Sequence, residues 1–233
     1  MDQDVLTPPE LQRLIAATDP NWRAAMGVLA YGGLRIGELL ALQWGDVELE
    51  AARILVQRQV ETGTGEIRDP KTAAGRRFVE LPAFVVRDLR LWKAACPPAP
   101  SGQADWCFPN ASGGPMDQYN FRSRTFLPAL RRAKLRRVRI HDLRHGCASM
   151  LVASGADIAA IRRHMGHANV AVTLGVYSHW FARRQDSGLG ARLEAFVEKE
   201  IGCVLVATDP NEEEAVSQVI ELMVGRVPTE FTS

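Results

Sequence analysis

The sequence predicts a mainly helical α+β domain that carries a small antiparallel β-sheet. Apolar residues recur at helical spacing over most of the chain, and several of these stretches start at a capping residue or stop at a glycine. Alternation of polar and apolar residues is confined to two short stretches, 53–60 and 77–81, as expected for a few short strands. Hydrophobic residues make up 46% of the 233 positions, so the chain can bury a core, and general disorder is excluded.

Capping residues and glycines define the first helices. Thr7, followed by two prolines and then Glu10, is typical of a helix start with a capping box. A second helix is predicted over residues 22–31, where a pair of glycines ends it. A third begins at Leu34-Arg35 and directs three leucines inward.

The two alternating stretches are predicted to be strands. A turn at residues 62–65 follows the first strand, and residues 69–75 form a loop that leads into the second. The remaining helices are predicted over residues 84–95, 117–133, 141–153, 158–164, 170–177 and 181–200. Beyond these, residues 203–207 favour a strand and residues 212–224 an acidic amphipathic helix.

The net charge of +1 conceals a strong asymmetry along the chain. Residues 122–144 contain nine basic side chains and one acidic side chain, a net charge of +8. Residues 194–233 contain nine acidic and two basic side chains, a net charge of −7. Most of the basic residues are arginines, whose planar guanidinium suits bidentate phosphate contacts, so the stretch indicates a phosphate-bearing partner.

The composition also indicates where the protein works. No apolar run reaches the ~18 residues that a membrane span needs. The 4 cysteines include no C-x-x-C pair, so we expect reduced thiols in a cytoplasmic protein that has no membrane partner.

The clustered histidines first suggest a metal site. His141 and His145 have the i, i+4 spacing of a zinc-binding helix, and His164 or His167 is a possible third ligand. However, an aspartate stands where such enzymes use a glutamate base, and an arginine lies between the two histidines. The cationic surroundings disfavour a divalent cation, so the residues fit a phosphodiester better.

The same residues can surround a phosphate. His141 and Arg144 are three residues apart, so on a helix they project from the same side. Arg35 opens another helix directly after the glycine pair, where backbone N–H groups add partial positive charge. Tyr177 lies ten residues beyond His167, and nearby arginines would stabilise its phenolate as a nucleophile.

Five motifs together carry a family resemblance. They are Gly33-Leu34-Arg35-Ile36-Gly37-Glu38-Leu39, Pro70-Lys71-Thr72, His141-Asp142-Leu143-Arg144-His145, Met165-Gly166-His167 and Val176-Tyr177-Ser178-His179. Their order and separations, over roughly residues 5–190, resemble the catalytic domain of tyrosine recombinases, the phage-type integrase family. The resemblance implies the integrase catalytic-domain fold. Gly146 and Met165 depart from the residues usual at those positions of the family.

The resemblance implies DNA strand cleavage and rejoining by transesterification. Tyr177 would attack the scissile phosphate to form a 3′-phosphotyrosyl intermediate. Arg35 and Arg144 would hold the non-bridging oxygens. The energy of the broken bond stays in the protein–DNA ester, so neither a metal, another cofactor nor ATP is implied.

The other site residues follow from the same resemblance. Lys71 would protonate the departing 5′-oxygen, His141 would accept or relay the tyrosine proton, and His167 would hydrogen-bond the phosphoryl group. The residues expected to support the site from behind are Glu38, Asp142 and His145. The residues expected to contact DNA more widely are Arg76, Arg77, Arg122, Arg124, Arg137 and Arg139.

The resemblance also implies partners and organisation. The partner would be double-stranded DNA, bound by a homotetramer that assembles on two DNA segments from monomers, in a bacterial or phage-infected cell and associated with the nucleoid. Residues 1–200 would form the catalytic domain, without the N-terminal core-binding domain, and residues 201–233 a tail that packs in cis or in trans. Integration, excision, resolution and transposition all stay open. The alternatives are a fragment that only binds DNA and relaxation of the type IB topoisomerase kind.

Overall fold

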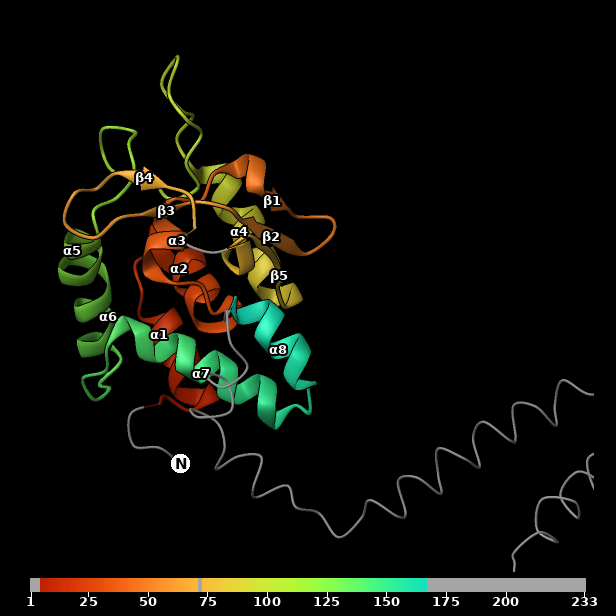
Figure 1. Ribbon diagram of the computed structural model, residues 1–233. Helices are drawn as coiled ribbons and strands as arrows, with labels where there is room; N and C mark the ends of the chain where they lie inside the picture. The colour runs from red at the N-terminus through yellow and green to blue at the C-terminus, as the bar shows by residue number, and fades with distance from the viewer. Residues whose placement is uncertain (1–4, 71–72, 167–233) are drawn as a thin grey trace, which may run out of the picture. The chain divides into compact units, whose positions relative to one another are not determined.

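The structure is a computed structural model that describes residues 5–70 and 73–166, all within one structural unit, Met1–Ala182. The elements predicted at 170–177, 181–200, 203–207 and 212–224 lie outside the described residues. In chain order the α-helices are α1 (Pro8–Ala16), α2 (Pro20–Gly27), α3 (Ile36–Leu40), α4 (Ala83–Ala95), α5 (Gln118–Asn120), α6 (Leu127–Arg132), α7 (Ile140–Ala153) and α8 (Ile158–Met165) (Figure 1). Short turns of π- or 3-10 helix extend or join them at η1 (Val28–Gly32), η2 (Trp44–Asp46), η3 (Ala73–Gly75) and η4 (Phe121–Phe126).

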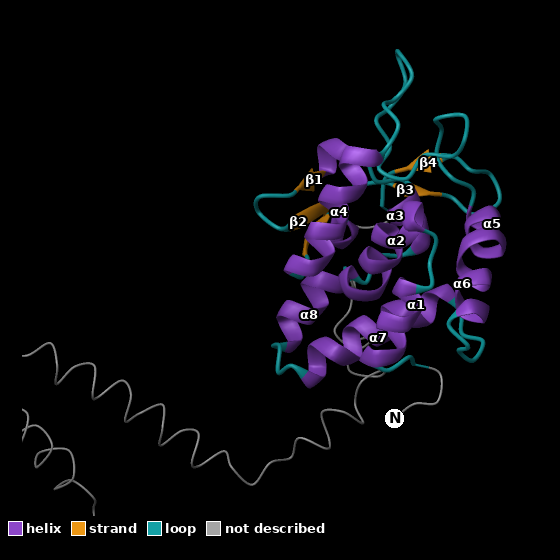
Figure 2. Cartoon of the chain, turned by 180° about the vertical axis from the view of Figure 1, so that it is seen from behind, coloured by secondary structure: helices purple, strands orange, loops and turns teal. Residues whose placement is uncertain are grey.

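The strands of the described residues are short and pair antiparallel (Figure 2). They are β1 (Val47–Glu48), β2 (Arg53–Val56), β3 (Gln59–Val60), β4 (Ile67–Arg68) and β5 (Arg77–Glu80). One sheet has the order β1-β2-β5, with Val56 opposite Arg77, and β3 and β4 form a separate hairpin. The structure therefore confirms the predicted fold class, a mainly helical domain with a small antiparallel sheet.

Local signals in the sequence place the start of α1 correctly. The Thr7 amide donates to Glu10 Oε2 at 2.7 Å, and its hydroxyl donates to the same oxygen at 2.9 Å. Leu11 and Leu14 are fully buried, as the helical spacing predicts. The same kind of hydrogen bond, from a backbone amide to a carboxylate three residues later, is found at the starts of α3 and α7. These two helices carry residues of the site described below.

The predicted strand over residues 53–60 is interrupted. It divides into β2 and β3 at Gln57 and Arg58, whose side chains both turn toward the buried carboxylate of Asp46. The Gln57 amide donates to Asp46 Oδ1 at 2.7 Å, and Arg58 donates to it at 2.5 Å. A buried charge must be paired, so Asp46 draws these two side chains out of the strand pattern.

The helical run predicted over 117–133 consists of α5, η4 and α6 in succession. Pro128, at the start of α6, has no N–H to donate, and the preceding turns widen into the π-helical segment η4. The run is therefore helical as predicted, but it is not a regular α-helix.

The core lies between the helices and the main sheet. Helix α7 packs along η1, and α8 packs against both α7 and β5. A second, smaller cluster of buried side chains joins α7 to α8 through Cys147, Val152, Ile161 and Met165. Among the described residues, no helix is both long and apolar enough to cross a lipid bilayer.

Candidate active site

Arg144 anchors α7 to two glycine turns. Its guanidinium is buried; Nη1 donates to the carbonyl oxygen of Gly33 at 2.6 Å, and Nη2 donates to the carbonyl oxygen of Met165. Gly33 and Gly166 both have φ near +64°, a left-handed conformation that glycine adopts without strain, so each turn brings a carbonyl to the arginine. Burial, together with the charge of Arg35, lowers the pKa of Arg144 to about 10, so it stays a cation at neutral pH.

Arg35 is the residue that precedes α3, and it is held by Glu38 one turn later. The Arg35 amide donates to Glu38 Oε2 at 2.8 Å, and Nη1 donates to Oε1 at 2.8 Å. The Glu38 side chain is 3% exposed whereas that of Arg35 is 41% exposed. Glu38 therefore lies behind Arg35 and leaves part of its guanidinium open to an anion.

The carboxylate of Glu38 is charged although it is buried. Burial alone would raise its pKa, but the hydrogen bonds and charge of Arg77, with those of Arg35, lower it to about 2. Glu38 is therefore ionised throughout the physiological range.

His141 lies in the first turn of α7, within electrostatic range of both arginines. Loss of hydration lowers its pKa, and the positive charges of His145, Arg144 and Arg35 lower it further. Its ring meets the ring of His145 edge-on, with centroids 4.8 Å apart. His141 is consequently neutral near pH 7, with a ring nitrogen able to accept a proton.

Three predicted site residues lie within electrostatic range of one another. The charge of Arg35 lowers the pKa of Arg144, and both arginines lower the pKa of His141. Arg35 precedes α3, whereas His141 and Arg144 lie in the first and second turns of α7, and the Arg144–Gly33 hydrogen bond ties α7 to the turn two residues before Arg35. The fold thus gathers cations that are far apart in the sequence.

Asp142 has a structural position within α7. Its carboxylate accepts from the Arg139 amide at 2.6 Å and from the Arg139 guanidinium at 2.8 Å. Although burial raises its pKa, these hydrogen bonds lower it overall. Asp142 fixes the first turn of the helix that carries His141 and Arg144.

Three predicted site residues, Lys71, His167 and Tyr177, lie outside the described residues. Residues beside two of them are nevertheless in contact. A Cβ on Gly166, next to His167, would lie 3.0 Å from the carbonyl oxygen of Ala74, at the end of the Lys71 loop. The described chain therefore brings these two segments together.

Arg77, which was predicted to contact DNA, turns inward in this structure. Its side chain is 5% exposed, and its guanidinium forms a two-point ion pair with Glu38. The first residue of β5 faces inward together with Val79, so the strand alternation could have shown that Arg77 is buried. The side chains of the other predicted DNA contacts are exposed: Arg76, Arg122, Arg124, Arg137 and Arg139.

His164, which the sequence suggested only as a possible metal ligand, also supports this region. Its Nε2 lies 3.1 Å from the carbonyl oxygen of Gly32, next to the turn that Arg144 holds. Within residues 5–70 and 73–166, no group of three or more histidine, cysteine or acidic side chains is arranged to hold a metal ion.

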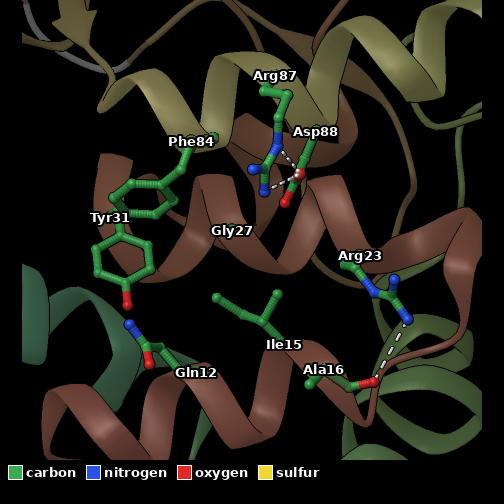
Figure 3. Close-up of a pocket in the computed structure, with 10 residues that line it drawn as sticks. Gln12, Ile15, Ala16, Arg23, Gly27, Tyr31, Phe84, Arg87 and Asp88 are labelled. Atoms are coloured by element: carbon green, nitrogen blue, oxygen red, sulfur yellow. Dashed lines mark hydrogen bonds and ion pairs between the residues drawn. The ribbon is translucent and has the colours of Figure 1, made fainter.

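A separate cavity of about 410 Å³ lies between α1, the α2–η1 helix and α4. Figure 3 shows the rings of Tyr31 and Phe84 at one end of it and Arg23 at the other. The two rings pack edge-on with centroids 4.8 Å apart, and Arg23 donates to the carbonyl oxygen of Ala16. None of the predicted site residues lines this cavity, so it is distinct from the arginine cluster.

Comparison with known proteins identifies the family. The sequence profile of the phage integrase family matches residues 4–184, and the chain therefore belongs to this family. A tyrosine recombinase XerC of Xylella fastidiosa (strain 9a5c) is 30% identical over 157 residues, 67% of this chain and 48% of the relative. The ICEBs1 integrase of Bacillus subtilis (strain 168) is 28% identical over 166 residues, 66% of this chain and 43% of the relative.

Solved structures of the same kind share the fold. The Tn1549 transposon integrase (residues 82–397), in complex with circular intermediate DNA, superposes with a TM-score of 0.67 at 25% identity, over 84% of this chain and 67% of that one. The XerA recombinase superposes with a TM-score of 0.61 at 25% identity, over 78% of this chain and 63% of that one. The family resemblance predicted from the sequence is thus confirmed. The chain spans about half the length of the curated relatives that it matches.

Proposed function

We propose that this chain is the catalytic part of a DNA strand transferase. It would cleave and rejoin duplex DNA through a 3′-phosphotyrosyl intermediate, with no metal and no ATP. One observation carries the proposal: Arg35, His141 and Arg144 lie within electrostatic range of one another, although they come from helices far apart in the sequence, within an integrase fold. Two cations suit a negatively charged phosphodiester. A neutral imidazole beside them can accept the proton that the attacking hydroxyl releases.

The proposed first step breaks one phosphodiester bond and forms another. The Tyr177 oxygen attacks phosphorus while its proton passes to His141, which is neutral because its pKa is lowered. The bond to the 5′-oxygen breaks, and Lys71 protonates that oxygen as it leaves. The reverse reaction, with a 5′-hydroxyl from a second duplex, restores the tyrosine and joins the new strands.

In this reaction the arginines bind the charge that develops on phosphorus. Arg35 and Arg144 hold the non-bridging oxygens, and His167 hydrogen-bonds to one of them. Arg144 suits this role because its hydrogen-bond acceptors are neutral carbonyls, so its own charge is not cancelled.

The proposed partner is double-stranded DNA. The Tn1549 integrase and the XerH recombinase were both solved bound to DNA, which supports this assignment. We further propose a homotetramer on two DNA segments, formed from monomers in the cytoplasm at the nucleoid, with residues 1–200 as the catalytic domain and 201–233 as a tail. The exposed arginines proposed to contact the duplex are Arg76, Arg122, Arg124, Arg137 and Arg139.

A pool of nicked suicide duplexes, randomised on both sides of the nick, tests the proposal. The expected result is a protein–DNA adduct that survives SDS and EDTA, disappears in Tyr177→Phe and persists in Tyr119→Phe, whose ring is 71% exposed on α5. DNA binding without an adduct would instead indicate a binding-only protein. Cleavage that EDTA abolishes, with no adduct, would indicate a metal-dependent hydrolase. Relaxation of supercoiled plasmid without sequence preference would indicate a topoisomerase-like activity.

A further inference from the structure

Arg77 forms more contacts than a simple ion pair would require. Its Nη1 and Nη2 donate to Glu38 Oε1 and Oε2 at 3.0 and 2.9 Å. Its Nε donates to the carbonyl oxygen of His164 at 2.7 Å, and Nη1 also donates to the carbonyl oxygen of Gly75 at 3.1 Å. A single guanidinium therefore joins α3, the C-terminal end of α8 and the segment that enters β5.

The contact with Glu38 leads to Arg35. Glu38 Oε1 accepts from Nη1 of both arginines, and Oε2 accepts from Arg77 Nη2 and from the Arg35 amide. Arg77 fixes the orientation of the Glu38 carboxylate. That carboxylate in turn orients Arg35. Moving Arg77 would therefore move Arg35.

The contact with α8 leads to Arg144. Arg77 binds the carbonyl of His164, and the carbonyl of the next residue, Met165, accepts from Arg144 Nη2. The packing is tight here, because a Cβ on Gly166 would lie 2.9 Å from Nη1 of Arg77. The end of α8 thus links Arg77 to the second arginine.

We propose that Arg77 is a positioning residue that sets both Arg35 and Arg144 in the geometry that grips a phosphate. The inference rests on the proposed function and adds to it a residue that touches neither DNA nor the reacting atoms. A buried ion pair often stabilises a fold no better than packed apolar side chains would, so stability alone does not account for Arg77 and Glu38. A role in orienting Arg35 and Arg144 does account for the buried pair of Arg77 and Glu38.

Two variants of the full chain separate positioning from folding. Arg77→Gln removes the charge, and Arg77→Lys keeps it but loses the two-point fork. The matched control is Arg53→Gln, which removes a half-buried arginine of the same sheet that pairs with Glu48. Cooperative urea unfolding first establishes that each variant is folded.

The first readout needs no DNA. In protein labelled with ¹⁵N-arginine, the NMR signals of the Arg35 and Arg144 guanidinium groups report their rotation and hydrogen exchange. In Arg77→Gln we expect exchange at both groups to rise by about tenfold or more, as follows when a hydrogen bond to a charged group is lost. Arg77→Lys should lie between wild type and Arg77→Gln, and Arg53→Gln should match wild type. Unchanged Arg35 and Arg144 signals in a folded Arg77 variant would overturn the proposal.

The second readout is the rate of adduct formation with saturating suicide DNA. Misplacing both arginines should lower this rate by about 100-fold in Arg77→Gln, while half-saturation by DNA shifts far less. Arg77→Lys should recover part of the rate. An unaltered rate in the folded variants would also overturn the proposal, because a purely stabilising ion pair gives that result.

The two readouts also separate this inference from the proposed function. If wild type forms no adduct while the NMR signals respond to Arg77, the proposed function fails and the positioning of the arginines stands. If Arg77→Gln does not fold, Arg77→Lys alone decides both readouts.

Discussion

Removal of the buried Glu38 carboxylate should strongly destabilise the fold, because it leaves the buried charge of Arg77 without its partner. Glu38→Gln removes the carboxylate charge while Arg77, 5% exposed, remains buried beside it. A pKa lowered from 4.5 to about 2 corresponds to about 3 kcal/mol of folding free energy at pH 7. Loss of one partner of a buried ion pair costs about 3–5 kcal/mol in other proteins. The pKa shift and these measured losses therefore predict a similar change in the free energy of unfolding.

The pH dependence of this loss has a definite sign. The folded-state pKa lies below the unfolded one, so the contribution of Glu38 is complete above about pH 4.5 and disappears as the pH falls through about 2. The difference in unfolding free energy between wild type and Glu38→Gln should therefore be constant from pH 7 to pH 6. It should fall to about half by pH 3.

Urea unfolding at several pH values measures this difference directly. Glu50→Gln is the control, because Glu50 pairs with Arg90 at the surface and its loss should hardly move the urea midpoint. A loss at pH 7 below about 1 kcal/mol, within the range of a surface pair, would refute the reasoning. A loss that stays the same down to pH 3 would refute it as well.

Three further substitutions or reagents probe the frame of the site. Gly33→Ala forces a Cβ into a backbone with φ of +64° and to 3.0 Å from the Cys147 sulfur; it should lower the free energy of unfolding by about 2 kcal/mol, whereas Gly45→Ala should be neutral. Asp142→Ala should cost about 1 kcal/mol in urea unfolding at neutral pH, with the loss shrinking once acid protonates the carboxylate. The buried Cys147 thiol, whose pKa is raised to about 12, should resist iodoacetamide at pH 8 until denaturant unfolds the protein; rapid labelling of the native protein, read by mass spectrometry, would contradict its burial.

The sequence predicts those parts of the fold that depend on neighbouring residues. Thr7 with Glu10 marks the start of α1, and Gly166 marks the end of α8, because caps and positive φ values are local properties. The interruption of the strand at Arg58 depends on Asp46, twelve residues away, and no local pattern contains it. The short strand β1 was missed for a similar reason, since it exists only through pairing with β2.

The same distinction between local and long-range interactions applies to the residues of the site. Arg35 and Arg144 could be singled out from helix starts and family motifs, and the fold places them within electrostatic reach of each other. Arg77 was assigned to the DNA surface, together with Arg76, on the basis of the family resemblance. Its true partner is Glu38, 39 residues away, and a buried ion pair of that separation has no local signature. Strand alternation could have placed Arg77 inside, but it could not have named what it binds.

The balance of charge in the cluster fits the proposed reaction. Arg35, Arg77 and Arg144 carry three positive charges, and Glu38 carries one negative charge that Arg35 and Arg77 share. Among the described residues, Arg144 donates to neutral carbonyls, so the four side chains have a net positive charge although three of them are largely buried. A carboxylate paired to each arginine would have given a more ordinary core and an electrically neutral site. A phosphodiester gains a second negative charge as the attacking oxygen joins it, and a fixed positive cluster stabilises that state more than the substrate. The positive charge that the described residues leave uncompensated is therefore what the proposed metal-free phosphoryl transfer requires.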